Sequence, residues 1–147
     1  MKSPDLFLVD FVARDMEATI AFYRALGVEI PEAAIWRTAT GVHHVDIRMP
    51  GGLIVHFDSP ALANVYDRGW RSPSGVGTRT VLSFKVKSRE EVDRLHAVLT
   101  QLGHASAQPP FDAFWGARYA IVEDPDGNHV GIMSPSDPSR RTALPQI

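Results

Sequence analysis

Histidine and charged residues alternate with apolar residues along two stretches of this sequence. In the first stretch His44, Asp46 and Arg48 occupy every second position, and in the second stretch His56 and Asp58 are also two positions apart. Because the side chains of a β-strand point alternately to its two sides, each set is expected to line a single face. Imidazole and carboxylate groups together can transfer protons, bind a divalent metal or hydrogen-bond a polar ligand. The two stretches therefore mark a candidate site.

Three interpretations of this polar face stay open. In the first, Asp46, Arg48 and Asp58 pair with one another in solvent, and the histidines are ordinary hydrogen-bonded residues. In the second, the charged groups orient a ligand whose apolar part packs on aromatic side chains. In the third, His44, Asp46 and His56 form a metal or acid–base site.

The strand that carries His56 ends a segment that occurs twice in the chain. Residues 50–60 and 125–135 each predict a turn, a short apolar strand and a stop at Ser-Pro. Four residues recur in step, and the pairs are Pro50 with Pro125, Gly52 with Gly127, Ser59 with Ser134, and Pro60 with Pro135. A repeated end indicates a repeated unit.

A strand and a helix precede each copy. The side chains of Asp15 and Ser88 are suited to cap the first turn of a helix. Gly27 and Gly103 are suited to end the two helices, because glycine takes the left-handed conformation without strain. Apolar residues recur at helical spacing between these limits. Alternation in residues 6–12 places Asp10 on the same face as the histidines.

The remaining segments alternate with the period of a strand. The predicted strands cover residues 6–12, 35–37, 42–49 and 53–57, and then 80–86, 105–108, 117–122 and 129–133. The predicted class is α+β, with two tandem βαβββ modules that form a curved mixed sheet around a cleft. The chain is expected to be a single domain over residues 1–147, with a first module at 5–60, a linker at 61–76, a second module at 77–135 and a loose C-terminal tail at 136–147.

Composition excludes several classes of function. The 147 residues carry a net charge of -2 and no clustered basic face, so no nucleic-acid partner is expected. No apolar run approaches the roughly 20 residues of a membrane span, and the N-terminus lacks a signal sequence, so we expect a cytoplasmic protein without a membrane partner. The absence of cysteine excludes disulfides, thiolate catalysis and zinc–thiolate sites.

Two stretches carry a family resemblance. Residues 114–119 (Phe-Trp-Gly-Ala-Arg-Tyr) and 123–128 (Glu-Asp-Pro-Asp-Gly-Asn) resemble the C-terminal signature of the vicinal oxygen chelate superfamily, and residues 14–27 resemble its first-helix signature. That superfamily includes glyoxalase I, extradiol dioxygenases, and fosfomycin- and bleomycin-resistance proteins. The resemblance implies paired modules around a cleft and frequent pairing of subunits, but the scaffold serves several functions.

The resemblance also implies four positions for metal ligands, one on the first and one on the last strand of each module. In this sequence the corresponding residues are Leu8, His56, Val81 and Gly131. Leucine, valine and glycine have no donor side chain, whereas a divalent metal needs about three or four protein ligands. The usual metal site of the superfamily is therefore expected to be absent.

Aromatic and basic residues of the second module complete the candidate set. Trp115 and Tyr119 could stack on a planar ligand, or could simply fill the space between the two modules. Arg118 could meet an anionic ligand, or could pair with a nearby carboxylate such as Glu123 or Asp124.

The leading hypothesis is a metal-independent protein that binds or sequesters a small organic molecule and resembles bleomycin-resistance proteins. It implies a homodimer, an aromatic or antibiotic-like ligand, and no cofactor. The predicted ligand-binding residues are His44, Asp46, Arg48, His56, Asp58, Trp115, Arg118 and Tyr119. The alternative is a glyoxalase- or dioxygenase-like lyase or isomerase with a divalent metal or acid–base groups at His44, Asp46 and His56.

Overall fold

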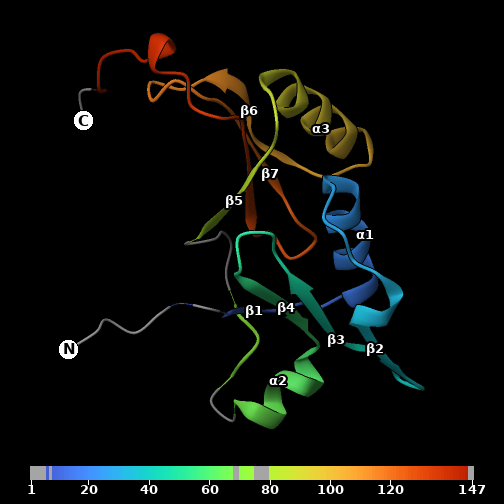
Figure 1. Cartoon of the computed structure of the whole chain (residues 1–147). Helices are drawn as coiled ribbons and strands as arrows, with labels where there is room; N and C mark the ends of the chain where they lie inside the picture. The colour runs from blue at the N-terminus through green and yellow to red at the C-terminus, as the bar shows by residue number, and fades with distance from the viewer. Residues whose placement is uncertain (1–5, 7, 68–69, 75–79, 146–147) are drawn as a thin grey trace, which may run out of the picture. The chain divides into compact units, whose positions relative to one another are not determined.

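Two four-stranded mixed sheets form the framework of the chain. The computed structural model describes residues 6, 8–67, 70–74 and 80–145, so parts of the expected first strand, linker and tail lie outside the described residues. Contacts divide the chain into two units, Met1–Gly75 and Val76–Ile147. The α+β class and the two tandem βαβββ modules predicted from the sequence are confirmed (Figure 1).

The first sheet has the strand order β1-β4-β3-β2. Its strands are β1 (Leu8–Val12), β2 (Ile35–Thr38), β3 (Gly41–Arg48) and β4 (Ile54–Asp58), with helix α1 (Met16–Leu26) after β1 and the short helix η1 (Glu32–Ala34) before β2. β1 runs parallel to β4, and β3 runs antiparallel to it. Helix α1 packs on this sheet through Tyr23, whose ring centroid lies 4.7 Å from that of Phe57.

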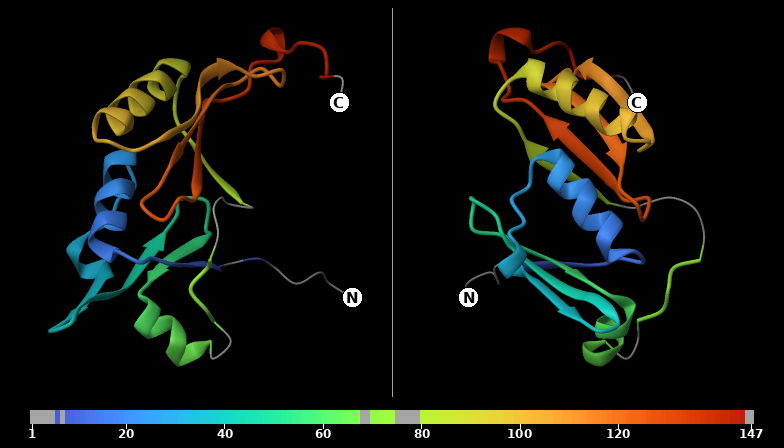
Figure 2. Two further views of the ribbon diagram at one scale, coloured as in Figure 1. Left: turned by 180° about the vertical axis from the view of Figure 1, so that it is seen from behind. Right: turned by 90° about the vertical axis from the view of Figure 1, so that its right-hand side faces the viewer.

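The second sheet repeats the arrangement in the order β5-β8-β7-β6. Its strands are β5 (Val81–Lys85), β6 (Ser106–Asp112), β7 (Arg118–Glu123) and β8 (His129–Met133), and helix α3 (Arg89–Gln101) follows β5. Helix α3 lies along β7 and β6 in both views of Figure 2. The predicted caps are confirmed: Asp15 accepts from the amide of Ala18 at 3.0 Å, and Ser88 accepts from that of Glu91 at 3.2 Å.

The predicted linker at 61–76 does not begin as a loop, because helix α2 covers Pro60–Tyr66. Ser59 accepts a hydrogen bond from the amide of Leu62 at 3.1 Å, and proline at the first helical position needs no amide partner. In this copy of the repeat the Ser-Pro pair starts a helix. In the other copy Ser134 instead accepts from the amide of Arg118 at 2.9 Å.

Strand β6 is longer than predicted and extends through Pro109 and Pro110 to Asp112. Its pairing with β7 shifts register twice, and it lies at the edge of the sheet. An edge strand tolerates proline because one side of it needs no amide donors. None of the helices in the described part of the chain combines the length and the apolar character of a membrane span.

The C-terminal tail is not loose over its described part. The short helix η2 (Pro138–Arg140) follows β8, and its flanks bind the loop between β6 and β7. The amide of Asp137 donates to the carbonyl of Gly116 at 3.1 Å, and that of Thr142 donates to the carbonyl of Phe114 at 3.0 Å. These backbone contacts tie the tail to the second module.

Replacement of Gly116 by alanine should destabilise the protein. Gly116 has φ +93°, and a Cβ there would collide with the backbone carbonyl of Asp137. Gly52 is a matched control, because its φ is +95° and a Cβ there meets no atom within 4 Å. Both variants carry about 1–3 kcal/mol of backbone strain, and Gly116→Ala adds the clash. Denaturant unfolding should therefore show a clearly larger loss for Gly116→Ala, and equal losses would contradict the docked tail.

Candidate functional site

One face of the first sheet carries six polar side chains. The polar face consists of Asp10 from β1, His44, Asp46 and Arg48 from β3, and His56 and Asp58 from β4. Strand register aligns them, since His44 lies opposite Asp58, and His56 lies between Asp46 and Asp10. The structure thus brings together the five candidate residues of the first module with Asp10, which the alternation in residues 6–12 had placed on the same face.

The most buried member of the polar face is Asp58, whose side chain is 2% exposed. His44 Nδ1 lies 2.6 Å from its Oδ1, and the hydroxyl of Tyr66 donates to its Oδ2 at 2.8 Å. A buried carboxylate needs such partners, because its transfer from water is otherwise costly. Tyr66 reaches the site because it lies at the end of α2. The sequence predicted a linker at residues 61–76 and therefore did not identify this contact.

His56 lies between two carboxylates. Its Nδ1 is 3.0 Å from Asp10 Oδ1, and its Nε2 is 3.6 Å from Asp46 Oδ1. Among the described residues Asp46 Oδ1 has no hydrogen-bond partner, although the atom is buried. Arg48 Nη2 lies 3.5 Å from the other Asp46 oxygen. The first interpretation of this face, mutual pairing, thus holds for Arg48 with Asp46, but it leaves one carboxylate oxygen unsatisfied.

The environment raises the pKa of two acidic groups next to Asp58, the Asp10 carboxyl and the Tyr66 hydroxyl. Burial and then the neighbouring Asp58 raise the pKa of Asp10, and His56 opposes this effect. Burial, followed by the hydrogen bond to Asp58, raises the pKa of the Tyr66 hydroxyl above its ordinary range. Both shifts favour the protonated form of a group next to Asp58.

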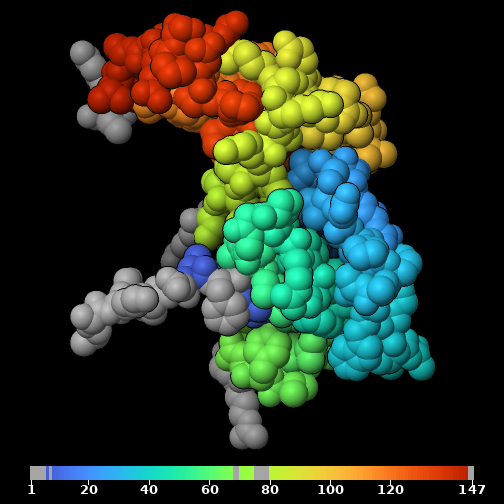
Figure 3. Space-filling view, in the orientation of Figure 1, coloured from blue at the N-terminus to red at the C-terminus, as the bar shows by residue number. Residues whose placement is uncertain are grey.

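The polar face borders an open hollow of about 720 Å³ on the first module. Its lining includes Trp36, His44, Asp46 and Arg48. The Trp36 side chain is 51% exposed, although tryptophan is usually well covered in a folded protein. The surface around η1 and β2, which contributes Trp36, is visible in light blue and cyan in Figure 3. The hollow offers a ligand both an aromatic surface and polar groups.

Three of these residues could hold a metal ion. His44, His56 and Asp58 have donor atoms that all lie within 4.8 Å of one another. The sequence predicted a metal or acid–base site at His44, Asp46 and His56, whereas in the structure the carboxylate close to both histidines is Asp58. The reason is the register, which sets His44 directly opposite Asp58.

The four usual metal positions of the superfamily do not fit a metal. Leu8, Val81 and Gly131 supply no donor side chain. The space beside Gly131 is also filled, because a Cβ there would lie 2.5 Å from Ser83 Oγ and 2.6 Å from the Tyr119 hydroxyl. Ser83 and Tyr119 are hydrogen-bonded to each other at 3.0 Å. The second module has thus filled a ligand position with two side chains of its own.

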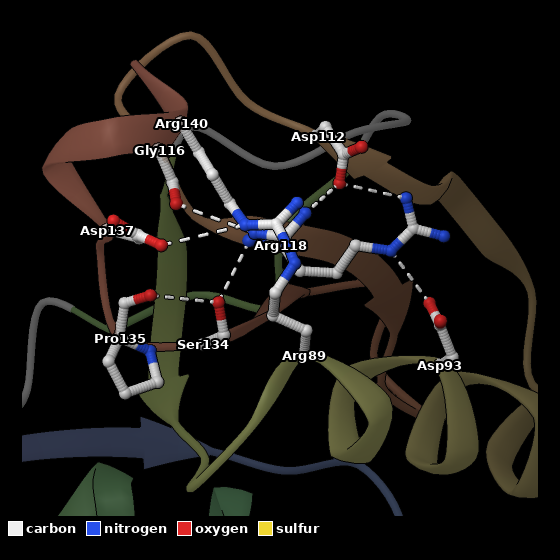
Figure 4. A network of polar contacts seen from close by, with 9 residues as sticks. All are labelled: Arg89, Asp93, Asp112, Gly116, Arg118, Ser134, Pro135, Asp137 and Arg140. Atoms are coloured by element: carbon white, nitrogen blue, oxygen red, sulfur yellow. Dashed lines mark hydrogen bonds and ion pairs between the residues drawn. The ribbon is translucent and has the colours of Figure 1, made fainter.

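Arg118 and Tyr119 lie on opposite faces of the second sheet. Arg118 points toward α3, where its Nε is 2.9 Å from Asp93 and its Nη1 is 3.2 Å from Asp112 (Figure 4). Arg118 therefore pairs with carboxylates, as one of the two interpretations held, but the partners are Asp93 and Asp112. Glu123 and Asp124 are not the partners, because alternation along β7 turns Glu123 to the other face, and Asp124 binds the turn at Asn128. A guanidinium held by two carboxylates is a structural element of this module.

Trp115 and Tyr119 belong to an aromatic cluster of the second module. Their ring centroids are 5.5 Å apart, and Tyr119 lies 6.1 Å from Phe111. Phe114 contacts Trp115 edge to face at 5.1 Å. The spacing is that of mutually packed rings, which contribute about 0.5–1.5 kcal/mol per pair beyond their burial. Both rings therefore pack within the second module, and their contact with the first module or with a ligand remains a prediction.

Comparison with known proteins defines the class. The profile of the Glyoxalase/Bleomycin resistance protein/Dioxygenase superfamily matches residues 6–132. The chain therefore belongs to this superfamily, as the resemblance in its sequence indicated. No curated protein matches the chain.

Solved structures share the fold. A glyoxalase/bleomycin resistance protein/dioxygenase family enzyme from Burkholderia phytofirmans has a TM-score of 0.71 at 23% identity, and the match covers 89% of this chain and 98% of that one. A hypothetical protein from Staphylococcus aureus has a TM-score of 0.66 at 24% identity and covers of 92% and 95%. A lactoylglutathione lyase from Agrobacterium tumefaciens has a TM-score of 0.61 at 21% identity and covers of 90% and 96%. At these identities the likeness shows the fold alone.

Gly131→Ala should destabilise the second module through overpacking alone. The backbone at Gly131 needs no positive φ, so the loss, about 1–3 kcal/mol, arises from contact with Ser83 and Tyr119. In a background that carries Ser83→Ala and Tyr119→Ala, the same substitution should lose most of its effect. Thermal or denaturant unfolding checks this for the wild type, Gly131→Ala, the Ser83→Ala/Tyr119→Ala double variant and the triple variant. An undiminished effect of Gly131→Ala in the double variant would show that other atoms fill the position.

Asp10 should titrate above its ordinary pKa of 3.8. Since the folded state then binds more protons than the unfolded state, the free energy of unfolding attributable to Asp10 falls as the pH rises through the interval above 3.8. Asp10→Asn removes this contribution, so the variant should lose less stability over the same rise in pH. Carboxyl-carbon NMR checks the pKa directly, and Asp58→Asn should lower it; an unchanged Asp10 pKa in that variant would contradict the coupling.

Proposed function

We propose that the chain binds and sequesters a small organic molecule on the polar face of its first module, without a metal at the superfamily's usual positions. The observation that carries the proposal is the convergence of His44, Asp46 and Arg48 on a hollow lined by Trp36. Ligand sites combine an apolar surface with a few polar groups that fix orientation.

The ligand would lie with its apolar or aromatic part on Trp36 and with hydrogen-bond donors toward the carboxylates. Asp46 Oδ1 supports this orientation, because it is buried and accepts no hydrogen bond among the described residues. A donor from a ligand would satisfy it, and hydrogen bonds to charged groups contribute about 1.5–3 kcal/mol. An antibiotic-like ligand belongs to the same proposal, because the superfamily includes bleomycin-resistance proteins. A homodimer and a cytoplasmic location, expected from the sequence, belong to it as well.

A second candidate is acid–base catalysis of the lyase or isomerase type. The buried Asp58 orients His44 through Nδ1, which leaves Nε2 of that ring available to accept a proton. A carboxylate that orients an imidazole in this way is a common arrangement for a general base. One solved structure with this fold is named a lactoylglutathione lyase.

Equilibrium dialysis against a mixture of small organic compounds, including bleomycin and aromatic amines, tests both candidates. Mass spectrometry would detect which compounds the protein retains, and whether any is converted, in EDTA buffer and in zinc buffer. Retention without conversion is expected, and Asp46→Asn should weaken it roughly tenfold, the equivalent of one charged hydrogen bond. Glu123→Gln, in the second module, is the matched control. Conversion of a retained compound would favour catalysis. If the protein retained no compound in either buffer, both candidates would be contradicted.

A further inference from the structure

The two imidazoles of the polar face are held in a fixed mutual arrangement. Their ring centroids lie 4.5 Å apart with an angle of 73° between the planes. They come from adjacent strands, since His44 lies on β3 and His56 on β4, and Asp58 follows His56 by two positions on the same face. Donor atoms of these three residues lie within 4.8 Å of one another, a separation that a single coordinated ion can span.

A carboxylate outside the group of three provides one ring with the orientation that metal-binding histidines need. Asp10 contacts His56 at Nδ1 at 3.0 Å. Histidine ligands almost always have such a partner on one ring nitrogen, which fixes the ring and its tautomer. Tyr66 further holds Asp58 by its hydroxyl at 2.8 Å. His44 Nδ1 and Asp58 Oδ1 lie 2.6 Å apart, so two of the three candidate ligands are already adjacent.

The charge of this cluster also favours a cation. Asp10, Asp46 and Asp58 lie around two imidazoles, and among these carboxyl oxygens Asp46 Oδ1 is buried without a hydrogen-bond partner in the described residues. This oxygen lies 3.6 Å from His56 Nε2. Arg48, the cation of the same face, is exposed and contacts only the other Asp46 oxygen among the ion pairs described. An ion between the imidazoles would therefore be bound next to an unsatisfied negative oxygen.

We propose that His44, His56 and Asp58 form a divalent transition-metal site contained entirely within the first module. The proposal rests on the same face as the proposed function and adds an ion to it. Two imidazoles and one carboxylate suit zinc or iron(II) and their neighbours in the first transition row. Only His56 coincides with a usual metal position of the superfamily, so this site is a relocated one. The adjacent hollow leaves room for a ligand beside the ion.

Zinc titration of the metal-free protein tests the site. After dialysis against EDTA and then against chelator-free buffer, isothermal titration with zinc chloride should show a single ion per chain. Cobalt chloride should give visible d–d bands that zinc abolishes. His44→Gln and His56→Gln should each weaken zinc binding by tenfold or more, since loss of even an orienting partner weakens metal sites roughly 10–100-fold. Melting temperatures of the metal-free variants, measured alongside, identify any variant that fails to fold.

His129→Gln is the matched control for zinc bound by an isolated surface histidine. His129 lies on β8 in the second module, is 30% exposed, and has Glu123 at 3.6 Å. Zinc affinity should be unchanged in this variant. Absence of zinc binding, or equal loss in the His129 variant and the His44 and His56 variants, would overturn the proposal. Retention of an organic compound by a protein that binds no zinc would refute the metal site alone, and zinc binding without retention would refute only the proposed function.

Discussion

The buried carboxylate of Asp58 determines how the first module is organised. It is 2% exposed at the end of β4, the strand that pairs with both β1 and β3. A carboxylate removed from water must be hydrogen-bonded, or the folded state is penalised by several kcal/mol. His44 from β3 and Tyr66 from α2 meet this requirement, and Asp10 from β1 lies close enough for its pKa to respond. One buried group thus connects three strands and a helix.

In the second module, side chains fill the position that corresponds to His56. Gly131 occupies the position that corresponds to His56, and the hydroxyls of Ser83 and Tyr119 take the room that a side chain there would need. Arg118, on the other face, is held between Asp93 and Asp112. The second module therefore uses its polar groups to stabilise itself, whereas the first leaves a buried Asp46 oxygen without a hydrogen-bond partner among the described residues. This asymmetry is the main reason why we propose a ligand site on the first module.

Sequence patterns predicted most of the framework. Helix limits at Asp15 and Ser88 were correct because capping depends on residues three positions apart. Strand β8 was predicted at its full length, since its alternation is bounded by a clear turn. The predicted element boundaries were wrong where the same short sequence pattern is compatible with two local structures. Ser59-Pro60 indicated a stop and instead starts α2, and the extension of the edge strand β6 through two prolines was missed.

By itself the sequence determined which side chains share a face, because the two-residue period of a strand is a local property. It placed His44, Asp46 and Arg48 on one side of β3 and found that three of the four usual metal positions lack donors. Only the tertiary structure decided which carboxylate meets which imidazole. That choice depends on the register between β3 and β4 and on the position of α2, which are set by contacts between residues far apart in the chain. The contact of Tyr66 with Asp58, that of Asp10 with His56, and the pairing of Arg118 with Asp93 became visible for this reason.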